Sequence, residues 1–125
     1  MGTNQTQKGY LCDSGETIVI ACSGASDLGQ VSDIVARKLR DNNVFKMNCL
    51  ADVGADVTPT IETFKAANLL IFDGCAVDCG KKILDKAGII NYQHIRITDL
   101  GYAKGRTTVT DEVINAVYKK FETCV

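Results

Sequence analysis

Four of the six cysteines in this 125-residue chain stand where a metal ion could be held or a thiol could act as a nucleophile. Cys22 and Cys49 each end a stretch that is predicted to be a strand, and Cys75 and Cys79 follow a third, at residues 69–72. Thiolates bind zinc and other soft metals, and they attack disulfides and other electrophiles. The function therefore depends on whether the fold brings these four side chains to one place.

The apolar run at residues 69–72 is short and bounded by polar residues, which predicts a strand buried on both faces of a sheet. Residues 82–87 have helical apolar spacing and stop at Gly88, so Cys75 and Cys79 are predicted to lie on a strand-to-helix turn. The first turn of a helix stabilises a thiolate through its free N–H groups and its dipole. With Cys75 at the helix cap and Cys79 one turn later, both side chains are expected on the same helix face.

Strands and helices are predicted to alternate along the rest of the chain. A first strand is expected to end at Cys22, after a short one at residues 10–12. The other strands are expected at residues 44–49, 69–72 and 94–98, the last as a half-exposed edge strand. Helices are expected after the glycine-bearing loop 23–30, from Pro59, after Cys79 and from an N-cap at Thr110, whereas residues 50–56 are expected to form a loop.

This alternation predicts a single α/β domain over residues 1–125, with residues 1–8 as a disordered tail. We expect a three-layer, Rossmann-like or flavodoxin-like architecture with a mainly parallel sheet of about four strands in the order 2-1-3-4. In that order the ends of strands one, two and three are neighbours. Cys22, Cys49 and Cys75 are then expected to meet at one edge, with Cys79 one helical turn away.

Packing is the alternative explanation for any one of these cysteines, because cysteine is among the most commonly buried residues. The C-x3-C spacing of Cys75 and Cys79 is not that of a zinc ribbon and is weak evidence alone. Three cysteines at predicted strand ends favour a site over packing. Cys12 and Cys124 lack this placement and are interpreted as lying outside the site.

Two other ionisable residues are ambiguous. His94, at the start of a strand, is interpreted as a surface or half-buried residue rather than a ligand. Asp73 is interpreted as bracing the turn by accepting hydrogen bonds from backbone N–H groups, with a supporting role behind the cysteines or acid/base chemistry as alternatives.

The loop at residues 22–29 has the glycines and hydroxyls that can cradle a phosphate before a helix, and a cysteine at its head. Cysteine-dependent phosphatases have such loops, but no arginine is present here to clamp a phosphoryl group, which argues against that activity. A tight turn with Ser26 or Asp27 near the helix cap is the favoured interpretation.

Composition narrows the classes of function. The chain is 46% hydrophobic and 23% charged with a net charge of −1, a soluble globular profile without the basic surplus that binds nucleic acid or anionic lipid. No apolar run approaches the roughly 20 residues that span a bilayer, and the first residues lack the features of a signal peptide. We therefore expect a cytoplasmic protein with no nucleic-acid or membrane partner, and its protein partner or small-molecule substrate is left open.

In a reducing compartment, six cysteines indicate metal, redox or catalytic chemistry rather than disulfides.

Three segments in order resemble a known family. Asp73-Gly74-Cys75 followed by Cys79-Gly80-Lys81 resembles the central motif of the DGC domain family, which is described as zinc-binding because of four cysteines proposed to chelate the metal. Two further segments are similar to the family's earlier motifs: Cys22-Ser23-Gly24-Ala25-Ser26 with Gly29-Gln30, and Cys49-Leu50-Ala51 with Gly54. The resemblance implies Zn²⁺ as the cofactor and Cys22, Cys49, Cys75 and Cys79 as its ligands. It implies no particular reaction.

Two hypotheses from different classes follow. The first is a zinc-binding protein whose four thiolates leave two net negative charges on the site, offset in part by helix N-termini and by Lys81 and Lys82. The second is a thiol-dependent redox or sulfur-transfer enzyme in which Cys75 or Cys79 is the nucleophile and the other resolves the intermediate. An iron–sulfur cluster is a third possibility, although the spacing matches neither of the usual ferredoxin patterns.

Overall fold

The computed structural model describes residues 17–122, which form a four-stranded sheet with helices on both faces. The sheet is parallel throughout and has the order β2-β1-β3-β4, so the predicted order and fold class are confirmed. Its strands are β1 (Thr17–Ala21), β2 (Lys46–Met47), β3 (Asn68–Asp73) and β4 (Tyr92–Arg96). The predicted tail at residues 1–8 and short strand at 10–12 lie outside the described residues, as do Cys12 and Cys124.

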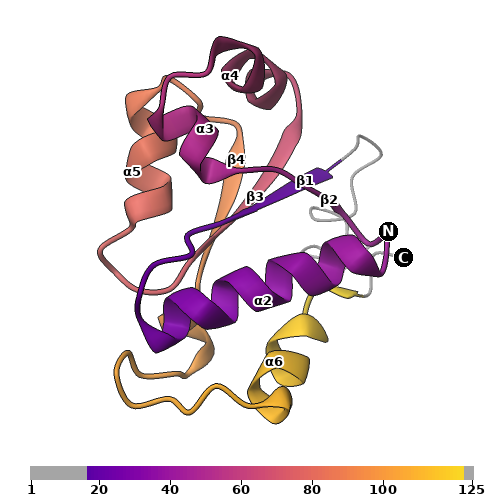
Figure 1. Ribbon diagram of the computed structural model, residues 1–125, viewed down its shortest axis with the longest axis vertical. Helices are drawn as coiled ribbons and strands as arrows, with labels where there is room; N and C mark the ends of the chain where they lie inside the picture. Colours follow the sequence, from indigo (N-terminus) through magenta and orange to yellow (C-terminus); the bar gives the residue numbers. More distant parts are fainter. Residues whose placement is uncertain (1–16, 123–125) are drawn as a thin grey trace.

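The helices form the two outer layers of the domain (Figure 1). Their bounds are α2 (Asp27–Asp41), α3 (Leu50–Gly54), α4 (Thr58–Lys65), α5 (Cys79–Lys86) and α6 (Asp111–Tyr118), with a 3-10 turn, η1, at Ile97–Leu100. α2 and α6 cover one face of the sheet, and α3, α4 and α5 cover the other. The predicted three-layer arrangement is therefore present.

The central strands β1 and β3 are buried on both faces, which explains why their sequences are continuously apolar. Val19 and Phe72 point into the core beneath α2 and α6, whereas Ile20 and Ile71 point into the core beneath α4 and α5. β4 is half-buried along its whole length, as predicted for an edge strand, but it covers Tyr92–Arg96 rather than the expected residues 94–98, because the chain turns into η1 at Ile97.

Most helix boundaries follow the predicted signals. The Ser26 hydroxyl at the N-cap of α2 accepts a hydrogen bond from the Gly29 N–H at 3.1 Å, and the Thr110 hydroxyl caps α6 in the same way. Pro59 lies in the first turn of α4, and the chain leaves α5 at Gly88 with a φ of +79°. These local signals placed the helices because capping depends on near neighbours in sequence.

Two predictions about local structure were wrong. The second strand, expected over residues 44–49, pairs only at Lys46–Met47, because β2 is an edge strand with β1 as its single neighbour. Residues 50–56, expected as a loop, contain the short helix α3, which begins directly after Cys49.

The start of α5 also differs from the prediction. The helix begins at Cys79 itself, and Asp78 is its N-cap with a left-handed backbone, φ 60° and ψ 42°. Cys75 therefore lies in the turn before the helix rather than at its cap, and the two cysteines do not share a helix face. The cause is the tight backbone turn at Asp78, which sequence periodicity does not reveal.

None of the helices within residues 17–122 combines the length and apolar character needed to cross a lipid bilayer.

The packing of α2 on the preceding loop gives a first test. A Cβ atom built on Gly29 would lie 2.4 Å from the Gly24 carbonyl oxygen, whereas one built on Gly54 would meet nothing within 4 Å. Gly29→Ala should therefore lower the free energy of unfolding by about 1–3 kcal/mol through overpacking. Gly54→Ala, the matched control, should be neutral or slightly stabilising because alanine has the higher helix propensity. Urea denaturation of both variants measures this, and equal stabilities would contradict the close approach.

Candidate functional site

The four predicted cysteines all lie at the carboxyl edge of the sheet, which we call the thiol edge. Cys22 directly follows β1, Cys49 directly precedes α3, Cys75 lies two residues beyond β3, and Cys79 begins α5. All four are free thiols; Cys22 and Cys75 are half-buried, and Cys49 and Cys79 are exposed.

The register of β1 and β3 determines which residues stand side by side at this edge. Ala21 is paired with Phe72, and the Cys22 N–H donates to the Phe72 carbonyl oxygen at 2.9 Å. From β1 the chain runs outward to β2 on one side, while β3 lies on the other side. The ends of β1 and β3 therefore flank the topological switch point, where open α/β sheets bind ligands.

The expected cluster of four thiols is not formed. Within residues 17–122, no three cysteine sulfurs lie within 4.8 Å of one another. Instead the thiols line two pockets: a larger one of about 600 Å³ with Cys22, Cys49 and Cys79, and a smaller one of about 300 Å³ with Cys22, Cys75 and Cys79. Cys22 and Cys79 thus connect the two.

The charges of these groups act on one another. Burial raises the pKa of the Cys22 thiol above its ordinary value, and a hydrogen bond from the Gly24 backbone opposes that shift. Negative charge on Asp73, Cys79 and Cys75 raises the same pKa further. Each ionised group therefore disfavours ionisation of Cys22, and a nearby positive charge would offset this repulsion.

Asp73 fixes the start of α5. Its side chain is 1% exposed, its Oδ1 accepts from the Gly80 N–H at 2.8 Å, and its Oδ2 accepts from the Lys81 N–H at 3.1 Å. The predicted bracing role is therefore confirmed. Gly80 is needed beside it, since a Cβ there would lie 2.8 Å from Ile71 and 2.9 Å from the Asp73 carboxylate.

His94 is half-buried, as predicted, with 17% of its side chain exposed. Its Nε2 lies 2.8 Å from Asp73 Oδ2 and 3.5 Å from Asp78 Oδ1. The Arg96 guanidinium donates two hydrogen bonds of 2.7 Å to the Asp78 carboxylate and holds the pKa of that carboxyl below its usual range.

These side chains are close enough to hold an ion, since ligand atoms of Asp73, Asp78 and His94 lie within 4.8 Å of one another. Their oxygens are nevertheless engaged by backbone N–H groups and by Arg96, so the arrangement is a hydrogen-bond network that fixes the turn. The sequence prediction missed Asp78 and Arg96. The two-residue spacing of His94 and Arg96 on an edge strand was the available signal, because it puts both on one face of the sheet.

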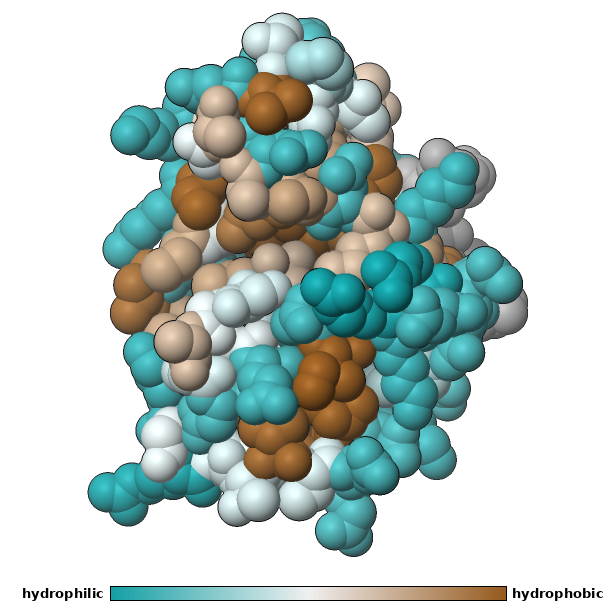
Figure 2. All heavy atoms as spheres, in the orientation of Figure 1, coloured by the Kyte–Doolittle hydropathy of each residue, from teal (hydrophilic) through white to brown (hydrophobic). Residues whose placement is uncertain are grey.

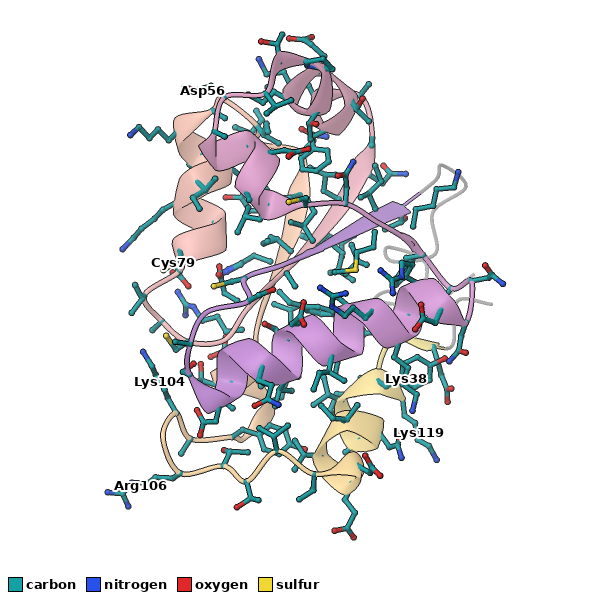
Figure 3. All side chains as sticks on the ribbon, in the orientation of Figure 1. Lys38, Asp56, Cys79, Lys104, Arg106 and Lys119 are labelled. Atoms are coloured by element: carbon teal, nitrogen blue, oxygen red, sulfur yellow. The ribbon has the colours of Figure 1, made fainter. Side chains whose placement is uncertain are left out.

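The basic residues near the thiols differ from those expected. Lys81 Nζ pairs with Asp85 at 2.8 Å, so this lysine is engaged along its own helix. Lys104 lines the smaller pocket instead and lies on the same side of the molecule as Cys79 (Figure 3). Local sequence carried no signal for Lys104, because a contact across nearly the whole domain holds its loop in place.

That contact is made by Asp27 at the start of α2. Its Oδ1 accepts from the Gly105 N–H and its Oδ2 from the Thr107 N–H, both at 2.9 Å. These donors lower the pKa of the Asp27 carboxyl. The loop before α6 is thereby held against the mouth of the smaller pocket, with Lys104 at its rim.

Removing the Asp73 carboxylate tests its role at the thiol edge. Asp73→Ala leaves the Gly80 and Lys81 N–H groups without their acceptor, which should lower the free energy of unfolding by about 1–3 kcal/mol. The first turn of α5 should also exchange its amide hydrogens faster. Asp99→Ala, at an exposed position, is the control for loss of one carboxylate. Unchanged stability and exchange at Gly80 would show that the helix start does not depend on Asp73.

The loop contact of Asp27 predicts a pH dependence. Since the folded-state pKa is lowered, the contact contributes above the unfolded value of about 3.9 and is lost as the pH falls through the folded-state pKa. The amide proton shifts of Gly105 and Thr107 should therefore titrate together in acid, as NMR can follow. Asp27→Ala should abolish this shared titration, and its persistence in the variant would rule the contact out.

Comparison with known proteins places the chain in a family. Residues 18–121 match the sequence profile of the DGC domain. A relative from Pseudomonas aeruginosa, the "Anaerobic and virulence modulator AnvM", is 30% identical over 88 residues, which is 70% of this chain and 67% of the relative. No solved structure matches. The match to the profile covers nearly the whole described domain, and the chain therefore belongs to the DGC domain family.

Proposed function

We propose that this protein binds one zinc ion through Cys22, Cys49, Cys75 and Cys79. The observation that carries the proposal is the placement of four free thiols around two pockets that share Cys22 and Cys79, at the carboxyl edge of a parallel sheet. Thiolate sulfur is the ligand type that zinc prefers in sites of this kind.

The donor set fits zinc in kind, whereas the spacing of the sulfurs is wider than a bound ion requires. Zinc–sulfur bonds near 2.3 Å place the sulfurs of a tetrahedral four-thiolate site about 3.8 Å apart. Binding must therefore draw the exposed Cys49 and Cys79 toward Cys22. Both stand at helix starts, Cys49 at the N-cap of α3 and Cys79 as the first residue of α5.

Charge supports the same proposal. Four thiolates on one zinc ion carry two net negative charges, which the N-terminal ends of α2 and α5 and the side chain of Lys104 would offset in part. Such a site has no open ligand position, so it would serve a structural or sensory purpose. Oxidation of its thiols would release the metal.

The name of the relative agrees with a sensory purpose. AnvM is named for anaerobic conditions and virulence. A thiolate site that loses its metal on oxidation would report on such conditions in this protein. We therefore favour a redox-dependent zinc site over a purely structural one.

Thiol-dependent redox or sulfur-transfer catalysis by Cys75 and Cys79 is the second candidate. It is favoured by the position of Cys75 in the turn before α5, because two cysteines one turn apart within a regular helix cannot easily form a disulfide. Because Cys75 lies outside the helix, helical geometry does not prevent a disulfide between Cys75 and Cys79.

Metal analysis of protein purified without oxygen and without an affinity metal tests the first candidate. We expect about one zinc per chain in the wild type, with about four thiols shielded from alkylation. Cys75→Ser should lose the metal. Cys124→Ser, which removes a cysteine outside the proposed ligand set, should retain it. A metal-free wild type with Cys75 and Cys79 oxidised as a pair would reject zinc binding and favour the thiol enzyme.

A further inference from the structure

The larger pocket at the thiol edge has features that a metal site does not need. It has a volume of about 600 Å³, within the range of small-molecule sites, and it opens between α2 and the start of α3. We call it the thiol groove and define it by Ser23, Arg37, Arg40, Cys49 and Cys79. In Figure 2, small and apolar residues gather between α2 and α3, bordered by strongly hydrophilic side chains over α2.

One wall of the thiol groove carries two arginines and one aspartate, Asp33, and so a net positive charge. Arg37 and Arg40 lie one helical turn apart on α2 and both line the groove. Each pairs with an aspartate on its own helix, Asp33 or Asp41, and about half of each arginine side chain is exposed. Exposed pairs of this kind are weak, and a guanidinium has five N–H donors, so both arginines keep the capacity to bind a carboxylate.

The facing wall supplies a reactive group. Cys49 is exposed, stands at the N-cap of α3 without a side-chain capping bond, and lines this pocket but not the smaller one. It follows β2, and β2 packs against α2, which carries the two arginines. Cys22 is less accessible, and Cys79, although exposed, also lines the smaller pocket.

We propose that the thiol groove binds a small disulfide bearing carboxylates, with the carboxylates on Arg37 and Arg40, and that Cys49 forms a mixed disulfide with it. The Cys49 thiol loses its proton to water, and the thiolate sulfur attacks the nearer sulfur of the bound disulfide. A new S–S bond forms as the old one breaks. The other half leaves with the electron pair as a thiolate and takes up a proton.

This step goes beyond zinc binding and does not require the metal. The step would also affect the proposed zinc site, because a mixed disulfide on Cys49 removes one of the four ligands of that site. The bound disulfide is itself the oxidant, and a reducing thiol reverses the step by the same exchange.

The test compares two disulfides of similar size on reduced, metal-free protein. Dithiodipropionate carries carboxylates and cystamine carries ammonium groups, and peptide mass spectrometry follows the mixed disulfide on Cys49. For the protein, the rate of mixed-disulfide formation with dithiodipropionate is divided by the rate with cystamine. This ratio is then divided by the same ratio for a peptide of residues 45–53, which corrects for the intrinsic reactivity of the two reagents. We expect the protein to favour the anionic reagent by about tenfold over the peptide.

Arg37→Gln with Arg40→Gln should bring the ratio down to that of the peptide. Lys119→Gln with Lys120→Gln removes the same charge from two exposed residues outside the thiol groove and should leave the ratio unchanged; Figure 3 shows Lys119 away from Cys79. A ratio equal to the peptide's in the wild type, or modification of other cysteines while Cys49 stays free, would overturn the proposal. Because the protein is metal-free throughout, these results are independent of whether zinc binds.

Discussion

The buried carboxylate of Asp73 determines where α5 begins, and the rest of the thiol edge depends on that position. A carboxylate at the end of the central strand is costly to bury unless its oxygens accept hydrogen bonds. The first free N–H groups of α5 and the ring of His94 supply those bonds. The same contacts place Cys79 at the pockets that Cys22 also lines, and they leave Cys75 in the turn between β3 and α5.

A second constraint comes from the layers above and below the sheet. α2 crosses one face and its N-terminus is joined by Asp27 to the loop before α6, so two distant segments form one wall of the smaller pocket. α5 forms the opposite side. The thiols therefore lie where the two outer layers meet, at the switch point, and each pocket draws residues from both layers. The proposed metal binding and the proposed thiol exchange would use some of the same side chains.

The sequence allowed the architecture to be predicted because its main signals are local. Buried strands appear as unbroken apolar runs, as at residues 69–72, and Ser26 and Thr110 mark helix starts through bonds to near neighbours. The alternation of strands and helices predicted the parallel sheet, and the expected order 2-1-3-4 put all four cysteines at one edge.

The detailed geometry of the site could not be predicted in the same way. The left-handed backbone of Asp78 moved the helix start by a full turn relative to Cys75, and an aspartate gives little warning of such a conformation. The pairing of Arg96 with Asp78 and the loop contact of Asp27 each join residues far apart in sequence. Side-chain spacing at the ångström scale, which decides whether sulfurs share an ion, depends on these distant contacts.

The short β2 strand has a consequence for how copies of this protein meet. A sheet edge offers unpaired N–H and C=O groups to any extended chain, and long edges promote association between molecules. Here the edge next to the exposed Cys49 pairs over two residues only and then turns into α3. Two molecules thus find little backbone on which to align at this edge, which lowers the chance that their exposed thiols are held together long enough to crosslink. The short β2 strand therefore disfavours edge-to-edge association beside Cys49.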